Sequence, residues 1–190
     1  MCTSFNLGGN ILNNIDNNFI RFERKEYYKY INKDIYPNDK AIVIKGEDNK
    51  KILDILNFGY KGYDKNSLIL NARSEGVFNK KTFRIDFRNN RVVIPMSKFY
   101  EWNYLKERSE FFPLEDSYLF ACGFTNGKRF VILTKDANEI VSPIHKRMPL
   151  LIGREKIDDW IFNDKLVRDI LKEDYINLKR RSDFEQISFL

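Results

Sequence analysis

The sequence predicts an α+β fold with mostly antiparallel β-sheet and flanking helices. Short runs of β-branched and aromatic residues recur along the chain, and turn-forming residues separate them. The 190 residues contain no repeat, low-complexity linker or shift in composition. A chain of this length can bury roughly 70% of its unfolded surface without disulfides or metals. We therefore expect a single domain that spans residues 2–190.

In the first half of the chain, hydrophobic spacing predicts one helix and several strands. Gly/Asn-rich residues 3–13 are expected to form a loop, and apolar residues at helical spacing predict a helix over 15–31. Tyr36-Pro37-Asn38-Asp39 indicates a turn. The remaining expectations are strands at 41–44 and 52–58 around a hairpin tip at 46–51, a loop at 59–66, and a buried strand at 68–70.

The second half adds more strands and the remaining helices. Phe83 and Phe87 share one face of a helix expected over residues 75–88. The other predicted elements are a strand at 92–94 ended by Pro95, strands at 99–104, 118–124 and 130–134, a charged connector at 105–117, helices at 157–162 and 166–171, and an edge strand at 184–190.

Composition excludes several classes of protein. No apolar run is long enough for a transmembrane helix or a secretory signal, which predicts a cytoplasmic protein without a membrane partner. The two cysteines form neither a disulfide framework nor a metal-ligand spacing, so we expect no metal or other cofactor, and Cys122 is expected to be a core residue. The net charge of +6, from 33 basic and 27 acidic residues, permits a phosphate-bearing partner without requiring one.

Cys2 becomes the first residue if Met1 is removed. Its α-amine and thiol would then form a 1,2-aminothiol, with reference pKa values of about 7.7–8.0 and about 8.5. With these pKa values, the amine and the thiol are each expected to be partly in the reactive base form near neutral pH. Such a group captures an aldehyde by forming an imine, to which the thiolate adds to close a thiazolidine. The alternative is that Cys2 is an incidental residue of a frayed terminus.

Three further segments place polar residues inside apolar sequence. Ser74 and Glu75 are interpreted as the cap of the following helix. This does not explain Asn71 and Arg73, which follow a buried strand and lie on one side of an extended chain. Glu101 lies between two large aromatic residues, where an apolar setting would raise its pKa and suit it to acid–base chemistry; otherwise it lies on the outer face of an edge strand.

The third segment contains the single histidine, His145, which precedes two cations and a proline. This setting is more typical of a cleft than of a core. If the protein uses a histidine in acid–base chemistry, it must be this one.

Together these segments resemble the SRAP (SOS-response-associated peptidase) family. They occur in that family's order and near its spacing, up to about residue 150. The matching motifs are Met1-Cys2, Asn71-Ala72-Arg73-Ser74-Glu75, Phe99-Tyr100-Glu101-Trp102, Thr134 with Ala137-Asn138, and Ile144-His145-Lys146-Arg147-Met148-Pro149. Where the family has Gly-Arg-aromatic after the cysteine, this chain has Thr3-Ser4-Phe5.

The resemblance implies a barrel-like fold and a role in DNA repair and the SOS response. A monomeric protein would bind abasic sites in single-stranded DNA or at single-strand/double-strand junctions, associating with the nucleoid when bound. It would shield the lesion by forming a thiazolidine crosslink through Cys2, and an associated autopeptidase activity would remove Met1. By similarity the catalytic residues are Cys2, Asn71, Glu101 and His145, and the DNA-binding residues are Arg73, Lys81, Thr134, Arg147, Tyr63 and Pro37.

Three other functions are compatible with the sequence. A DNA-binding module without the crosslinking chemistry is suggested by the missing Gly-Arg after Cys2. An amidotransferase with an N-terminal cysteine nucleophile would need no basic face. A cysteine peptidase acting on other proteins could use Cys2 and His145, but the sequence indicates no substrate groove.

Overall fold

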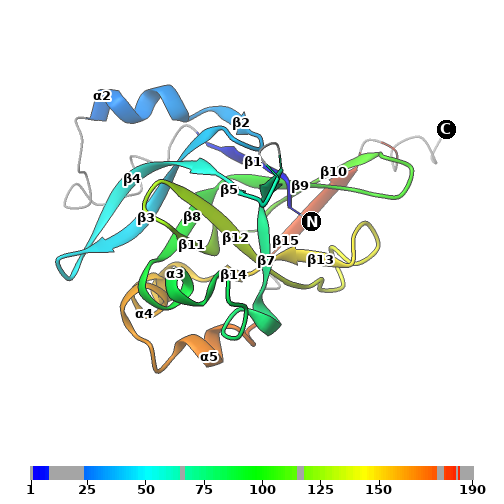
Figure 1. The fold of residues 1–190 in the computed structure, drawn as a ribbon. Coiled ribbons are helices and arrows are strands. Elements are labelled where there is room, and N and C mark those ends of the chain that lie inside the picture. Colours follow the sequence, from blue (N-terminus) through cyan, green and yellow to red (C-terminus); the bar gives the residue numbers. More distant parts are fainter. Residues whose placement is uncertain are drawn as a thin grey trace.

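A computed structural model of the chain describes residues 2–8, 24–64, 67–114, 118–174, 178–182 and 184. Within these residues the strands form two large sheets and one two-stranded sheet, and nearly all neighbouring strands are antiparallel (Figure 1). Helices α3, α4 and α5 gather at one end of the molecule, away from α2. The predicted α+β class with mostly antiparallel sheet is therefore confirmed.

The larger sheet closes into a barrel. Its strands follow the order β13-β12-β4-β3-β8-β11-β14, and β12 also pairs with β11, which joins the ends of the five central strands into a ring. The bounds are β3 Lys40–Glu47, β4 Lys50–Phe58, β8 Arg91–Met96, β11 Leu119–Thr125, β12 Arg129–Asp136, β13 Arg147–Pro149 and β14 Leu151–Ile152. The short strand β7 (Asn71–Arg73) adds to β12 in parallel register.

A second, antiparallel sheet has the order β15-β10-β9-β1-β2. Its strands are β1 Ser4–Leu7, β2 Lys33–Ile35, β9 Lys98–Trp102, β10 Arg108–Pro113 and β15 Leu178–Ser182. Strand β9 lies in the middle and pairs with β1 on one side and β10 on the other. The second residue of the chain is thereby brought next to a strand about one hundred residues away in sequence.

Short helices and one hairpin complete the fold. The two-stranded sheet joins β5 (Tyr60–Lys61) to β6 (Leu68–Ile69). The helices are α2 Arg24–Tyr27, α3 Arg84–Asn89, α4 Ile157–Phe162 and α5 Val167–Ile170, with 3-10 turns η2 Tyr28–Tyr30, η3 Ser74–Gly76 and η4 Arg154–Lys156. None of the helices in the described part of the chain is long and apolar enough to cross a membrane.

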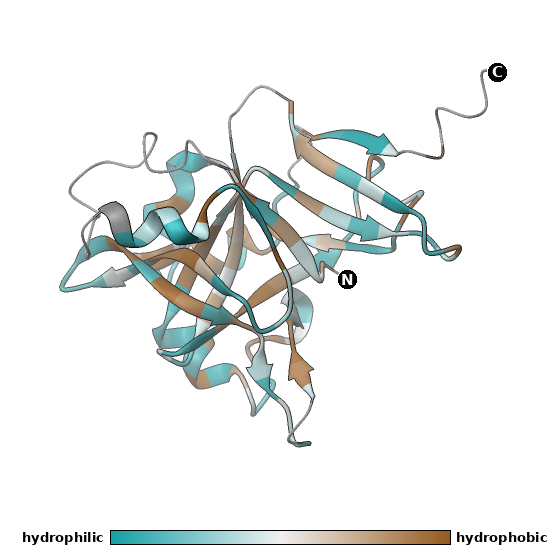
Figure 2. Cartoon of the chain, turned by 90° about the horizontal axis from the view of Figure 1, so that it is seen from above, coloured by the Kyte–Doolittle hydropathy of each residue, from teal (hydrophilic) through white to brown (hydrophobic). Residues whose placement is uncertain are grey.

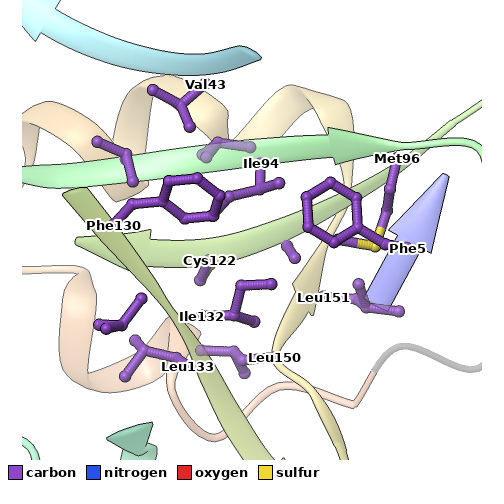
Figure 3. Packing of buried hydrophobic residues seen from close by; sticks show 14 of the residues in the cluster. Phe5, Val43, Ile94, Met96, Cys122, Phe130, Ile132, Leu133, Leu150 and Leu151 are labelled. Carbon is purple, nitrogen blue, oxygen red and sulfur yellow. The ribbon is translucent and has the colours of Figure 1, made fainter. Parts of the chain in front are cut away.

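A hydrophobic core links the barrel to the second sheet. Hydrophobic residues concentrate along the strands, whereas the connecting turns are mostly hydrophilic (Figure 2). Phe5 of β1 meets Phe58 of β4 edge to face at 5.6 Å, and Phe58 stacks on Phe130 of β12 at 5.2 Å. Figure 3 shows Phe5 and Met96 at the same end of this cluster. The packing of Phe5 anchors the strand that follows Cys2.

Several predicted elements are confirmed. The hairpin of β3 and β4, the turn before it, and strands β6, β9, β11 and β12 lie where the sequence placed them, as do α4 and α5. Of the helix predicted over 15–31, residues 24–31 are described; residues 24–30 are helical, and residue 31 is a bend. The edge strand predicted at 184–190 lies outside the described residues apart from residue 184.

Other predictions are wrong for identifiable reasons. The helix expected over 75–88 is a 3-10 turn followed by a short helix, although Phe83 and Phe87 are both buried as the helical spacing required. The connector at 105–117 contains β10, whose charged residues occupy only alternate positions. Strand β8 continues through Pro95 because β3 pairs with it only at Val92 and Val93, leaving one edge of β8 unpaired at the proline.

Two expected loops also contain strands, and one strand was not predicted at all. The loop expected at 3–13 includes β1, and the loop expected at 59–66 includes β5. Strand β15 lies in a stretch for which we predicted no element. In each case the strand is short, and its partner strand supplies the stability that its own residues lack.

We predict that Gly123→Ala destabilises the barrel by about 1–3 kcal/mol. A Cβ atom at this position of β11 would collide with the Val131 carbonyl and lie 2.7 Å from Cδ1 of Ile94. Chemical unfolding would measure the change. Gly76→Ala is the matched control, because no atom lies within 4 Å of a Cβ built there. Equal stability of the two variants would contradict this description of the core.

Candidate functional site

Cys2 is buried just before β1. Its thiol donates a long hydrogen bond of 3.7 Å to the carbonyl oxygen of Ser4. The side-chain Nδ2 of Asn71, at the start of β7, donates to the carbonyl oxygen of Cys2 at 2.9 Å. Two of the four predicted catalytic residues are therefore in direct contact, and the amide of Asn71 holds the main chain at the position of Cys2.

Glu101 is buried beside Cys2. It is only 1% exposed, on the central strand β9. Burial raises the pKa of Glu101 to about 7, although the positive charge of the chain's amino terminus lowers it in part. The charge of Glu101 in turn raises the pKa of Cys2. The alternative placement of Glu101 on the outer face of an edge strand is wrong.

The pKa of the Cys2 thiol differs from the value expected from the sequence. Desolvation by burial raises its pKa well above the ordinary value, and the negative charge of Glu101 adds to this effect. The prediction that the thiol is partly ionised near neutral pH is therefore wrong for this structure. A reaction at Cys2 needs a group that accepts the thiol proton, and Glu101 is the adjacent candidate.

His145 follows the turn at residues 139–144 and is half-buried. The backbone N–H of Arg147 donates to its Nδ1 at 3.0 Å, and the carbonyl oxygen of the same residue lies 3.1 Å from Nδ1. Nδ1 therefore has a backbone partner whether it is protonated or not. Burial lowers the pKa of His145, and the charges of the amino terminus and Arg147 lower it further. The neutral imidazole is favoured at pH 7.

The guanidinium of Arg147 is held by two carboxylates. Nη1 lies 2.6 Å from Glu75 and 2.6 Å from Asp136, and Nη2 donates to Glu75 at 3.0 Å and to the Thr134 carbonyl at 2.6 Å. The prediction that Ser74 and Glu75 cap a helix is wrong: no side-chain cap is formed at this turn, and Glu75 instead pairs with Arg147. Arg147 can bind a phosphate only in exchange for these carboxylates.

An open groove of about 690 Å³ runs past His145. Its walls combine the cations Arg73, Lys146 and Arg147 with the aromatic residues Trp102 and Tyr104, together with Asn103, Asp136 and Ile144. Arg73 reaches the groove because β7 pairs in parallel with β12, which places Arg73 beside Thr134. Cations next to aromatic rings suit a ligand with both phosphates and flat bases.

The other predicted DNA-binding residues occupy different settings. Thr134 is buried on β12, and its Oγ1 has no hydrogen-bond partner among the described residues. Lys81 is exposed before α3, Tyr63 is 95% exposed beyond β5, and Pro37 is exposed in the turn between β2 and β3. None of these three lines the groove.

Four residues of the site were missed from the sequence. Glu75 and Asp136 hold Arg147, and Trp102 and Tyr104 form the aromatic wall of the groove. Trp102 adjoins Glu101 in the motif and could have been included. Tyr104 lay at the edge of a segment read as a connector, so nothing indicated that a hairpin would turn it toward His145.

No cluster of three or more His, Cys, Asp or Glu side chains in the described part of the chain could hold a metal ion. The functional groups that the four predicted catalytic residues supply are a thiol, a carboxylic acid, an amide and an imidazole.

Solved structures share this fold. A protein from Bacteroides thetaiotaomicron matches with a TM-score of 0.79 at 18% identity, covering 97% of this chain and 94% of that one. A protein from Bordetella bronchiseptica matches with a TM-score of 0.71 at 16% identity, covering 95% and 99%. In its fold and site, this chain is a barrel protein whose Cys2 is buried beside a carboxylic acid.

The model of the SOS response associated peptidase (SRAP) family matches residues 1–185, and the chain belongs to this family. The abasic site processing protein YoaM of Bacillus subtilis is 29% identical over 106 residues, which cover 49% of this chain and 47% of YoaM. The abasic site processing protein YedK of Escherichia coli is 25% identical over 140 residues, 67% of this chain and 63% of YedK. The matched segment spans about half the length of the Bacillus relatives.

We predict that Glu101 makes stability depend on pH. Because the folded pKa of about 7 exceeds the ordinary value of 4.5, the neutral acid favours folding; this contribution is complete below pH 4.5 and is lost as pH rises through 7. One pKa unit corresponds to about 1.36 kcal/mol, so the unfolding free energy of the parent relative to Glu101→Gln should fall by roughly 3 kcal/mol from pH 4.5 to 8. Urea unfolding measures it, with Glu47→Gln as the surface control. A constant difference would contradict the assigned pKa.

We also predict that Glu75→Gln lowers the pKa of His145. Removing the Glu75 carboxylate leaves more of the positive charge of Arg147 uncompensated beside the imidazole, which disfavours its protonated form. The single histidine gives one set of imidazole resonances, so an NMR titration reads its pKa directly. Glu47→Gln, at the exposed end of β3, is the control. An unchanged or raised pKa in Glu75→Gln would refute the coupling.

Proposed function

We propose that this protein binds abasic sites in single-stranded DNA or at single-strand/double-strand junctions and crosslinks to them through Cys2 once Met1 has been removed. The crosslink shields the lesion during DNA repair in the SOS response. Family membership and the names of the abasic site processing relatives support this proposal. The observation that carries it is the burial of Cys2 beside Glu101, a carboxylic acid with a pKa of about 7.

The reaction joins an aldehyde to an aminothiol with loss of one water. The α-amine of Cys2 adds to the aldehyde carbon of the ring-opened sugar, and Glu101 protonates the departing oxygen so that water leaves and an imine forms. The imine retains one hydrogen of the amine and is therefore an iminium ion. The thiol proton passes to the Glu101 carboxylate, the sulfur bonds to the iminium carbon, and the C=N electron pair returns to nitrogen. Glu101 thus returns to its acid form, as a pKa near 7 allows.

The neighbouring residues take supporting roles. His145, neutral at pH 7, transfers the proton that opens the sugar ring. Asn71, which already holds the Cys2 carbonyl, keeps the new amine in position for attack. Removal of Met1 by the same residues is the associated autopeptidase activity, a hydrolysis at the Met1–Cys2 bond.

DNA is held through its backbone and recognised by its missing base. Phosphate contacts come from Arg73, Lys81, Thr134 and Arg147, with Arg147 exchanging its carboxylate partners for phosphate. Tyr63 stacks on a base, and Pro37 blocks the continuation of a duplex. Binding is sequence-tolerant and weakens with salt, and the protein acts as a cytoplasmic monomer that joins the nucleoid through DNA.

We predict that the parent gives a covalent adduct with an oligonucleotide carrying one abasic site, seen by intact mass spectrometry as the sum of both masses less one water. Cys2→Ala should abolish the adduct, because it removes the sulfur that closes the ring. Cys122→Ala is the matched control, since Cys122 is also buried but lies in the core. Glu101→Gln should slow adduct formation by about 10²–10⁴-fold.

Two results would overturn the proposal. An equally fast adduct with Cys2→Ala would exclude the thiazolidine. Tight, salt-sensitive binding without an adduct, from protein shown by intact mass to lack Met1, would instead identify a DNA-binding module.

A further inference from the structure

We propose that the tip of the β9–β10 hairpin, formed by Tyr104 and Leu105, is a stacking platform for the nucleobase next to the abasic position. This inference rests on the proposed function, because it names how the DNA beside the lesion is held. It adds a second aromatic contact, independent of Tyr63, at the wall of the groove that contains His145.

The tip exposes two large apolar side chains side by side. Tyr104 is 91% exposed and Leu105 is 60% exposed. A single exposed apolar residue needs no explanation, but an adjacent pair at the edge of a groove forms an uncovered apolar surface. The side chain of Tyr104 also lines the groove, so its ring is available to a ligand that occupies it.

The tip is ordered by its own hydrogen bonds. The side-chain Oδ1 of Asn103 accepts from the backbone N–H groups of Leu105 and Glu107, each at 3.0 Å, and Nδ2 of Asn103 donates to the Glu107 carboxylate at 2.7 Å. Lys106 adopts a left-handed conformation with φ 64°, which is unfavourable for a residue with a side chain. The hairpin thus fixes the main chain on both sides of Tyr104 before a ligand arrives, which reduces the backbone entropy lost on binding.

The surroundings of Tyr104 favour a single-stranded nucleic acid as the occupant. Arg73 and Lys146 line the same groove, and Asp136 is its one carboxylate, already paired with Arg147. A positively charged groove beside an aromatic ring is the arrangement that binds phosphates and stacks bases. An apolar protein surface that buried Tyr104 would leave the charges of Arg73 and Lys146 without counterparts, whereas a nucleic acid supplies both a flat base and phosphates.

The chemistry of the lesion explains why a ring is useful here. An abasic nucleotide leaves one face of the neighbouring base without its stacking partner. His145 lies in the same groove as Tyr104, so the lesion's neighbour is the base nearest the ring. Stacking on Tyr104 replaces the missing contact and draws the sugar toward the catalytic residues. Any base has a flat face, so this contact tolerates sequence but requires a base.

The test measures binding to an oligonucleotide that carries tetrahydrofuran, an unreactive abasic analogue, with 2-aminopurine on one side or the other. Cys2→Ala is the background, so that no covalent step contributes. Stacking on Tyr104 should quench the 2-aminopurine fluorescence on one side of the lesion, and Tyr104→Ala should remove this quenching and weaken binding about 5- to 100-fold. Tyr104→Phe should retain both, because it keeps the ring. Tyr28→Ala is the matched control, since Tyr28 is 57% exposed but does not line the groove.

A second oligonucleotide lacks both bases next to the lesion. Parent and Tyr104→Ala should bind it equally if the ring contacts a base. A Tyr104→Ala defect of the same size on both oligonucleotides, or unchanged quenching in this variant, would overturn the platform. A thermal melt shows whether the variant is folded, and the exposure of Tyr104 predicts no change.

These binding measurements, together with the adduct assay on protein that retains Cys2, separate this inference from the proposed function. Stacking by Tyr104 without any adduct at a natural abasic site would support the platform and refute the crosslink. If Tyr104→Ala forms the adduct as fast as the parent and shows the same quenching, the crosslink is supported and the platform is refuted. Failure of the parent to bind the DNA would overturn both.

Discussion

The burial of Glu101 beside Cys2 is the constraint on which the rest of the site depends. Two acidic groups that share an apolar environment cannot both be ionised, because each charge lacks solvation and each repels the other. The carboxylic acid therefore titrates near neutral pH and the thiol stays protonated above it. The site holds one movable proton under ordinary conditions, which suits a reaction that needs an acid in one step and a base in the next.

The two sheets impose this burial through their connections. Strand β9 pairs with β1 on one side and with β10 on the other. Glu101 therefore cannot become exposed to water unless the hydrogen bonds between β9 and these strands break. Strand β1 is held by Phe5, whose ring packs against Phe58 inside the barrel. Asn71 belongs to the barrel and holds the Cys2 main chain from the opposite side. The cysteine thus lies where the barrel and the second sheet meet, and neither unit alone would position it.

The sequence predicted the class of fold and most strands because alternating and β-branched patterns are local signals. It failed where stability comes from a partner. Strand β10 was interpreted as a charged connector because it contains Arg108 and Glu110, but Glu110 is buried and paired with Lys98 and Arg181. The proposed catalytic set could be brought together only through the family resemblance, because no spacing in the sequence relates Cys2 to Glu101. Its burial and pKa are properties of the assembled sheets and are not readable from the chain.

The groove carries less net positive charge than its cations Arg73, Lys146 and Arg147 suggest. Arg147 is already neutralised by Glu75 and Asp136, so a phosphate that binds it displaces carboxylates as well as counterions. Such an exchange contributes less to affinity than binding to a solvated cation, and it lowers the salt dependence per contact. The net charge of +6 is therefore a poor measure of the DNA affinity that the proposed function requires. In the proposed complex, base stacking on aromatic rings such as Tyr104 therefore supplies a larger share of the binding free energy. Stacking does not depend on the release of counterions.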